Sequence, residues 1–368
     1  MSIQNKLVLA YLGVILLVAC STMVVLTQAP ASPANPEPTD TAFVEPSRTL
    51  GAPPAAPAET IIVDLPIVMQ SPTLTPTATE PPAPQTARFA VIGDYGLAGQ
   101  PEADVASLVS GWQPDVVITT GDNNYPNGAQ NTIDENIGQY YHAFIYPYLG
   151  SYGQDADQNR FFPSLGNHDW VATGAQPYLD YFSLPGNERY YEFTWGPVHF
   201  FALDSDGHEP DGVSSSSAQA AWLQDRLAAA LEPWKIVYMH HPPYSSGLHG
   251  SITWMRWPFR EWGATAVISG HDHTYERILR DGFPYFVNGL GGGAIYSFIS
   301  IVNGSQFRYN ADYGAMLVEA DPTSLSFYFY RRNGQLIDSY TITSGMAAAR
   351  QGAEGLLLPR LSRLPINP

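Results

Sequence analysis

Five short apolar segments of this chain each end in a turn that carries Asp, Asn or His. The segments read FAVI, VVITT, FFPSL, KIVYM and ATAVIS, and the turns after them begin GDYG, GDNNY, GNHD, HH and GHDH. Runs of this length and composition, bounded by Gly, Pro or Asp, are typical of buried strands. Open α/β sheets bind ligands outside the carboxyl ends of their strands, so we expect the five turns to converge on one place. Glycine at four of the turns lets the backbone bend sharply there.

The rest of the same region predicts an α/β fold. Further strands are expected at 198–203, 284–288, 315–319 and 326–331. Residues 217–231 place Ala and Leu at helical spacing behind serines that can cap a helix, and 102–112 is a weaker helix candidate. Strands that alternate with helices and then give way to a strand-rich end predict an α/β sandwich over residues 88–343.

The N-terminal residues 1–26 predict a membrane anchor or a signal. Residues 7–26 form an apolar run behind Lys6 that is long enough to span a hydrocarbon core as an uncleaved anchor. Alternatively, the sequence LVAC resembles a bacterial lipoprotein signal, with Cys20, the only cysteine, as the lipid attachment point. Both interpretations predict an exported, extracytoplasmic protein that is tethered to a membrane.

Two further segments flank the predicted domain. Residues 27–87 hold 14 of the 32 prolines, interleaved with Ala, Thr and Ser. Proline removes backbone donors and fixes φ, so we expect a disordered, extended linker that holds the domain away from a membrane. Residues 344–368 form a C-terminal tail, for which a docked turn of helix and a disordered end both stay open.

The composition excludes several classes of protein. A single cysteine excludes a disulfide framework, a Cys-rich zinc module and an iron–sulfur cluster. The domain at 88–343 carries 27 acidic and 12 basic side chains and therefore most of the net charge of −17. No basic surplus is available to neutralise phosphates, which excludes nucleic acid as a partner. The electrostatic field of this negative charge repels polyanions, so small anionic substrates must be captured by groups within the site.

The polar turns supply the donors of a dinuclear metal site. Carboxylate, amide and imidazole groups are hard donors that suit Fe, Zn and Mn. Here they are Asp94, Asp122, Asn167, His240, His271 and His273. Two metals about 3.5–4 Å apart clamp the attacking and leaving oxygens of a displacement at phosphorus.

The five blocks together resemble those of the calcineurin-like metallophosphoesterases. Tyr125, three residues after Asp122, and the block HTYER that begins at His273 are similar to the purple acid phosphatase branch, which includes the tartrate-resistant acid phosphatases. The spacing of the blocks also matches that family over most of residues 88–280. The resemblance implies an α-β-β-α sandwich with two mixed sheets.

The resemblance also implies two ligand sets that share one carboxylate. The first metal, expected to be Fe(III), is held by Asp94, Asp122, Tyr125 and His273. The second, Fe(II), Zn or Mn, is held by Asp122, Asn167, His240 and His271. A phenolate on Fe(III) would colour the protein, and a metal-bound hydroxide would attack phosphorus.

Two histidines are the candidate catalytic groups beside the metals. His168 follows a ligand, and Asp169 is expected to orient its ring. His249 lies nine residues after His240, where the family places a histidine on the substrate side. Either histidine would bind the phosphoryl oxygens or protonate the leaving alkoxide. His241 is expected to act behind the ligands, and Tyr244 to line the pocket.

Three functions follow from this set of residues. The first is hydrolysis of small phosphomonoesters by an exported acid phosphatase, which Tyr125 and the HTYER block favour. The second is a phosphodiesterase of the same superfamily that acts on nucleotides or glycerophosphodiesters; the resemblance implies that this branch usually lacks the tyrosine ligand that Tyr125 supplies here. The third is a surface binding module without turnover, but such a module should have lost ligands, and all seven are present here.

Overall fold

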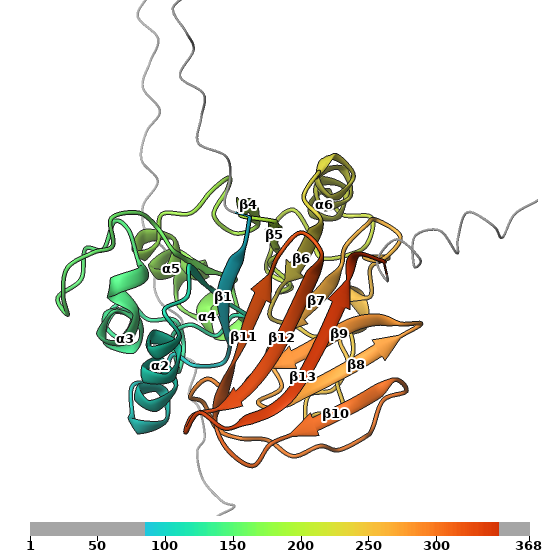
Figure 1. Cartoon of the computed structure of the whole chain (residues 1–368). Helices are drawn as coiled ribbons and strands as arrows, with labels where there is room; N and C mark the ends of the chain where they lie inside the picture. Colours follow the sequence, from blue (N-terminus) through green and yellow to red (C-terminus); the bar gives the residue numbers. More distant parts are fainter. Residues whose placement is uncertain (1–84, 346–368) are drawn as a thin grey trace, which may run out of the picture. The chain divides into compact units, whose positions relative to one another are not determined.

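The structure is a computed structural model that describes residues 85–345 (Figure 1). The predicted anchor or signal at 1–26 with Cys20, nearly all of the linker at 27–87 and nearly all of the tail at 344–368 lie outside the described residues. Those interpretations therefore stay predictions. Between residues 85 and 345, no helix combines the length and the apolar character that a bilayer span requires.

Two mixed sheets form the centre of the domain (Figure 1). The first sheet has the order β13-β12-β11-β1-β2-β3 and the second the order β10-β8-β9-β7-β6-β5-β4. The strands of the first sheet are β1 (Ala87–Ile92), β2 (Val116–Thr119), β3 (Phe161–Pro163), β11 (Gly314–Ala320), β12 (Ser324–Arg331) and β13 (Leu336–Thr343). Those of the second are β4 (Tyr191–Trp195), β5 (Val198–Ala202), β6 (Trp234–Tyr238), β7 (Ala266–Ser269), β8 (Tyr275–Arg280), β9 (Phe283–Asn288) and β10 (Ser305–Tyr309). In both sheets the strands that precede most of the polar turns run parallel.

Aromatic side chains join the two sheets. Phe89 of β1 meets Phe200 of β5 edge to face, with 4.8 Å between ring centroids. Phe286 of β9 stacks on Phe327 of β12 at 4.6 Å. All four rings are buried, and aromatic pairs of this kind contribute roughly 0.5–1.5 kcal/mol beyond the area they bury. This packing fixes how the strand ends of one sheet face those of the other.

Helices cover the outer faces of both sheets. The longer helices are α2 (Gln100–Trp112), beside the first sheet, and α6 (Ala218–Ala229), which packs on the second. Shorter helical segments are η2 (Asp134–Gly138), α3 (Gln139–Tyr141), η3 (His142–Phe144), α4 (Asn167–Val171), η4 (Thr173–Ala175), α5 (Gln176–Tyr181) and η5 (Thr253–Met255). Ser217 caps α6 by accepting a hydrogen bond from the backbone N–H of Ala220, as the serine run predicted. The predicted sandwich with two mixed sheets is confirmed.

The sequence did not predict four of the strands, and charged residues interrupt the apolar pattern of two of them. The four strands are β4, β8, β10 and β13. β8 reads YERILR and β10 reads SQFRY, so charged residues interrupt the apolar run in each. Both strands find their place by pairing, β8 with β9 and with β10.

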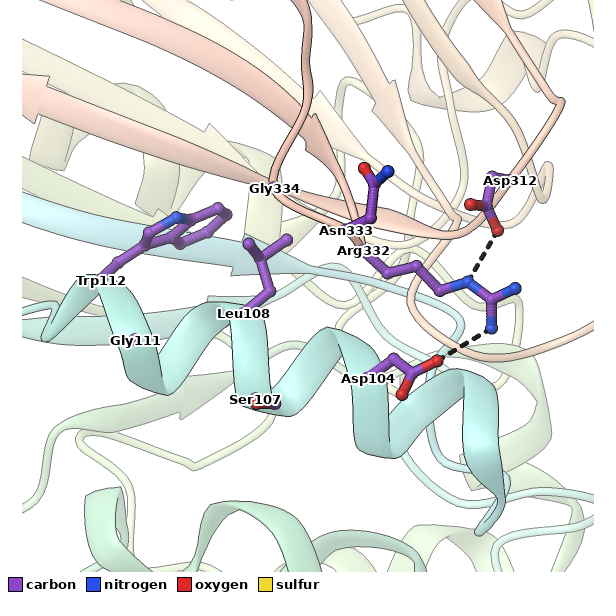
Figure 2. Close-up of a pocket in the computed structure, with 9 residues that line it drawn as sticks. All are labelled: Asp104, Ser107, Leu108, Gly111, Trp112, Asp312, Arg332, Asn333 and Gly334. Carbon is purple, nitrogen blue, oxygen red and sulfur yellow. Dashed lines mark hydrogen bonds and ion pairs between the residues drawn. The ribbon is translucent and has the colours of Figure 1, made fainter.

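A surface pocket between α2 and the turn after β12 lies apart from the predicted site (Figure 2). Arg332 bridges it, with its guanidinium 3.0 Å from Asp104 and 2.8 Å from Asp312. None of the residues that line the pocket belongs to the polar turns. Partly exposed ion pairs of this type contribute about 0–1 kcal/mol each. Here they link helix α2 to the loops beside the first sheet.

Candidate metal centre

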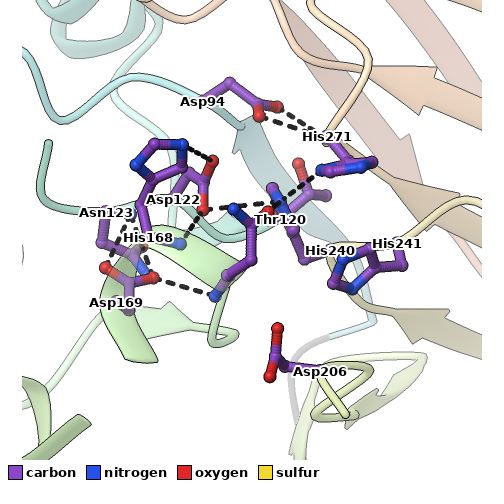
Figure 3. A network of polar contacts seen from close by, with 12 residues as sticks. Asp94, Thr120, Asp122, Asn123, His168, Asp169, Asp206, His240, His241 and His271 are labelled. Atoms are coloured by element: carbon purple, nitrogen blue, oxygen red, sulfur yellow. Dashed lines mark hydrogen bonds and ion pairs between the residues drawn. The ribbon is translucent and has the colours of Figure 1, made fainter. Parts of the chain in front are cut away.

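The polar turns of the two sheets meet at one place, and each sheet supplies a different kind of donor (Figure 3). The first sheet supplies oxygen: Asp94 follows β1, Asp122 follows β2 and Asn167 begins α4 behind β3. The second supplies nitrogen: His240 follows β6, and His271 and His273 lie between β7 and β8. In Figure 3 the carboxylates of Asp94 and Asp122 face the rings of His240 and His271. The structure thus confirms that these turns converge.

Three of these donor residues have left-handed backbones. The φ angles are 54° at Asp94, 52° at Asp122 and 69° at His271. Residues with side chains adopt this region at a cost of order 1–3 kcal/mol, and they cluster at functional sites. Each follows a glycine, and a Cβ on Gly270 would lie only 2.5 Å from Oδ2 of Asp94. The glycines therefore allow the donors to approach one another.

Four side chains form the first cluster, and Tyr125 sits at its centre. The Tyr125 hydroxyl donates to Oδ2 of Asp122 at 2.9 Å and lies 3.0 Å from Nε2 of His273. Nε2 of His273 is also 3.3 Å from Oδ1 of Asp94. Burial, and then the charges of Asp122 and Asp94, raise the pKa of Tyr125. A phenolate would therefore form here only beside a cation that reverses this effect.

His240 lies at the centre of the second cluster. Its Nδ1 donates to the carbonyl of Thr120 at 2.9 Å, so Nε2 is the atom that faces the other donors. Nε2 lies 2.9 Å from Oδ1 of Asn167, 3.1 Å from Nδ1 of His271 and 3.4 Å from Oδ1 of Asp122. Asp122 thus directs one oxygen toward each cluster, the position that a bridging ligand requires.

The electrostatics of the centre favour bound cations. Burial opposes protonation of His240, but Asp122 and Asp94 outweigh it and raise the pKa of the ring. For His271, burial and the neighbouring His240 ring lower the pKa, so that imidazole is a neutral donor. Asp94, Asp122 and His273 offer ligand atoms that all lie within 4.8 Å of one another. Buried carboxylates with neutral imidazoles are a donor set that fits hard or borderline divalent and trivalent ions.

His168 lies at the edge of the first cluster. Its ring is 4.6 Å from that of Tyr125, and Nε2 is 3.9 Å from Oδ2 of Asp122. The contact that orients the ring differs from the one expected, because Nδ1 lies 2.6 Å from the carbonyl of Pro126. Asp169 instead accepts hydrogen bonds from the backbone N–H groups of residues 123 and 166, behind the ligands.

His249 lies over the second cluster. Its ring stacks on that of His271 at 4.4 Å, and its backbone N–H donates to Oδ1 of Asp272 at 2.7 Å. Oδ2 of Asp272 accepts from the backbone N–H of Gly250 and from the hydroxyl of Ser245. Because Asp272 stands between His271 and His273, the turn that carries these two candidate ligands also holds the loop of His249.

His241 lies beside the second cluster, close to His271. The ring of His241 lies 4.5 Å from that of His271, and its Nδ1 lies 3.0 Å from Oγ of Ser205. With His240 and His271 it offers nitrogens that lie within 4.8 Å of one another, which is closer to the ligands than expected.

Tyr244 points away from the clusters, toward the outer face of the second sheet. Its ring packs on Tyr285 of β9 at 4.9 Å. The guanidiniums of Arg256 and Arg280 lie over it, at 4.7 and 4.9 Å from the ring centroid. We expected Tyr244 to line the pocket, but its ring packs against the apolar cluster on the outer side of the second sheet.

Sequence reasoning missed Tyr296. Its ring stacks on His273 at 4.1 Å with an interplanar angle of 9°, and it meets the ring of His249 edge-on at 5.4 Å. Burial, and then Asp94 and Asp122, raise the pKa of its phenol. A glycine run precedes it, and a Cβ on Gly293 would lie 2.9 Å from the His273 ring. That run was the only signal of a close approach.

The fold and the centre together define a metallophosphoesterase. The chain belongs to the calcineurin-like phosphoesterase family, whose model matches residues 87–275. Among curated proteins it is similar to purple acid phosphatase 17 of Arabidopsis thaliana, with 26% identity over 56% of this chain and 68% of that one. It is also similar to the mouse (Mus musculus) tartrate-resistant acid phosphatase type 5, with 25% identity over 71% of this chain and 91% of that one.

Solved structures agree on the fold. A purple acid phosphatase from yellow lupin (Lupinus luteus) seeds aligns with a TM-score of 0.55 at 20% identity, over 72% of this chain and 55% of that one. GAP50, the anchor in the inner membrane complex of Plasmodium, aligns with a TM-score of 0.56 at 17% identity, over 76% of this chain and 98% of that one. The protein is therefore an acid phosphatase-like metallophosphoesterase, a hydrolase whose relatives imply two metal ions.

Proposed function

We propose that this protein is an exported acid phosphatase that hydrolyses phosphomonoesters at an Fe(III)–M(II) centre, where M is Fe, Zn or Mn. The observation that carries the proposal is the place of Tyr125, whose hydroxyl lies between Asp122 and His273. A phenol held among a carboxylate and an imidazole suits a hard, strongly Lewis-acidic ion.

The ligand sets are those that converge in the structure. Asp94, Asp122, Tyr125 and His273 would hold the iron. Asp122, Asn167, His240 and His271 would hold the second ion. When bound, the two ions supply Lewis acidity that activates water and offsets charge on the phosphoryl oxygens.

The chain's own residues then orient the ester and move one proton. Asp122 keeps the two clusters together, because its oxygens face Tyr125 and His240. His168, in α4 behind β3, lies beside the first cluster, and His249, on the loop after β6, lies over the second. Each has a ring nitrogen with which to bind a phosphoryl oxygen or to protonate the departing alkoxide. Of the two, His249 stacks directly on a ligand, so we assign it the proton transfer.

The proposed location outside the cytoplasm rests on the N-terminal sequence. An apolar run at 7–26 followed by a proline-rich segment suits a tethered, exported domain, through either a membrane span or a lipid on Cys20. Fractionation of the producing cells, with globomycin-type inhibition of lipoprotein processing, separates the two anchors. Recovery of the intact chain in the soluble cytoplasmic fraction would contradict both.

The test of the chemistry compares phenyl phosphate with diphenyl phosphate at acid pH. We expect turnover of the monoester by the wild-type protein to exceed that of the diester by at least about tenfold. Purified protein should absorb visible light, and Tyr125→Phe should lose that absorption. A colourless, iron-free and active enzyme would remove the Fe(III) assignment, whereas preference for the diester would replace the proposed substrate class.

A further inference from the structure

Two loops beside the metal centre contain no acidic residue, lysine or arginine. They are residues 240–255 and 289–304, whereas the domain at 88–343 has 39 such residues. Four of the large apolar side chains that the structure exposes lie on these loops. They are Leu248 (53% exposed), Trp254 (45%), Ile299 (63%) and Ile301 (56%), and we call them the apolar rim. Exposed apolar groups that gather near a site mark a surface that another apolar group covers.

The two loops form one surface because hydrogen bonds join them. The carbonyl of Ser246 accepts from the backbone N–H of Ile299 at 2.8 Å, and its hydroxyl accepts from that of Val302 at 3.0 Å. Ser246 in turn donates its own N–H and hydroxyl to Glu276, which is fully buried. A buried carboxylate thus fixes the loops, so the apolar rim has a defined position.

The apolar rim is continuous with the metal centre. Leu248 directly precedes His249, whose ring stacks on His271 at 4.4 Å. The ring of Trp254 lies 6.1 Å from that of His241, and its indole N–H donates to the carbonyl of Ser205. On the other loop, Tyr296 stacks on a ligand and stands three residues before Ile299. The apolar rim therefore adjoins the groups that would bind an ester.

We propose that the apolar rim is the subsite for an uncharged, apolar leaving group, so that the preferred substrates are phosphates of long-chain, lipid-like alcohols. This inference rests on the proposed phosphomonoesterase function. A charged leaving group, such as a second phosphate, would find no lysine or arginine on either loop to pair with it. In the reaction, the oxygen of water bonds to phosphorus and the bond from phosphorus to the alcohol oxygen breaks. The alcohol oxygen departs with a proton, so the products are the alcohol and inorganic phosphate.

A homologous series of alkyl phosphates tests the inference. Ethyl, butyl, hexyl and octyl phosphate share the same leaving-group chemistry, and each is assayed below its aggregation concentration. A fully buried methylene contributes roughly 0.8 kcal/mol, about fourfold, so a half-covered chain should raise kcat/KM about twofold per methylene. A series that is flat in chain length would overturn the inference.

Variants locate the effect. Leu248→Ser combined with Ile299→Ser should reduce the dependence of kcat/KM on chain length to near unity per methylene. The matched control is Leu231→Ser, which removes a 94% exposed leucine outside both loops and should keep the full dependence. All three positions are exposed, and thermal melting checks that the variants are folded. An unchanged dependence in the double variant would also overturn the inference.

A binding readout separates this inference from the function on which it rests. Alkylphosphonates carry the same chains but are not hydrolysed, and they should inhibit phenyl phosphate turnover more strongly as the chain lengthens. Turnover of phenyl phosphate without chain dependence in either series would refute the subsite and leave the phosphatase. Absence of turnover with every monoester would refute both.

Discussion

The two sheets bring opposite chemistry to one centre. The first sheet presents oxygen donors, and both of its carboxylates, Asp94 and Asp122, are almost wholly buried. The second presents imidazoles, and the charges that act on them differ: the pKa of His240 is raised by nearby carboxylates, whereas that of His271 is lowered by burial and by its neighbours. Neither half offers a complete ligand set, because a cation needs the charge of one and the neutral donors of the other.

Packing between the sheets is therefore part of the candidate metal site. The aromatic contacts of Phe89 with Phe200 and of Phe286 with Phe327 set how far the two strand ends stand apart. Asp122 reaches both clusters, with one oxygen at Tyr125 and the other near His240. Changes that remove one donor should therefore affect one metal, and changes at the shared carboxylate should affect both.

Loss of the shared carboxylate should have the largest effect. Asp122→Asn removes the charge that faces both Tyr125 and His240, so we expect both metals to be lost and turnover to fall by more than roughly 100-fold. Metal content by mass spectrometry and phenyl phosphate turnover are the two measurements. Asp104→Asn on α2 is the control and should change neither. Full metal content and activity in Asp122→Asn would defeat the account in which it joins the two halves.

Variants of His249 and His168 compare the catalytic contributions of the two sheets. His249→Ala should lower kcat by roughly 100-fold or more, the lower end for a general acid, while both metals stay bound. His168→Ala should mainly raise KM, because its ring lies at the edge of the first cluster and is partly exposed. Steady-state kinetics and metal analysis of both variants decide the order. A loss of metal in His249→Ala would make that residue a ligand.

Asp272 should have an intermediate effect through the position of His249. Asp272→Asn keeps one acceptor but weakens the bonds to the backbone of residues 249 and 250. We expect kcat to fall about tenfold with KM and metal content nearly unchanged. Replacing residues that hydrogen-bond to the groups of a site typically lowers activity about 10–100-fold. The double variant with His249→Ala should then show no further loss. Additive losses would show that Asp272 acts independently of His249.

The smallest effect concerns stability on the side of the first sheet. Glu102 of α2 is buried, and burial raises its pKa although the backbone of Leu97 opposes the shift. When the pKa of a carboxyl is higher in the folded than in the unfolded chain, its contribution to stability is fully present below the unfolded-state pKa. That contribution is lost as the pH rises through the folded-state pKa. Glu102→Gln should therefore raise Tm by a few degrees at pH 8 and by less at pH 4. An equal shift at both pH values would show that ionisation of Glu102 is not the cause.

The sequence predicted that most of the candidate metal ligands converge, because each of them follows a short strand. Asp94, Asp122 and His271 stand directly after glycines, and the sheet order brings those turns together. It did not predict Tyr296, or the outward direction of Tyr244, because each depends on a loop whose path is set by contacts far along the chain. Strands such as β8 were missed for a similar reason, since pairing rather than local pattern stabilises them.

Metal stoichiometry shows most directly whether two metals are bound between the sheets. Purified full-length protein should bind two metal ions per chain, with iron as one of them. His240→Ala should keep the iron and lose the second ion, whereas Asp122→Asn should lose both. A wild-type protein that binds a single ion, or a His240→Ala variant that loses iron first, would contradict the assignment of one metal to each cluster.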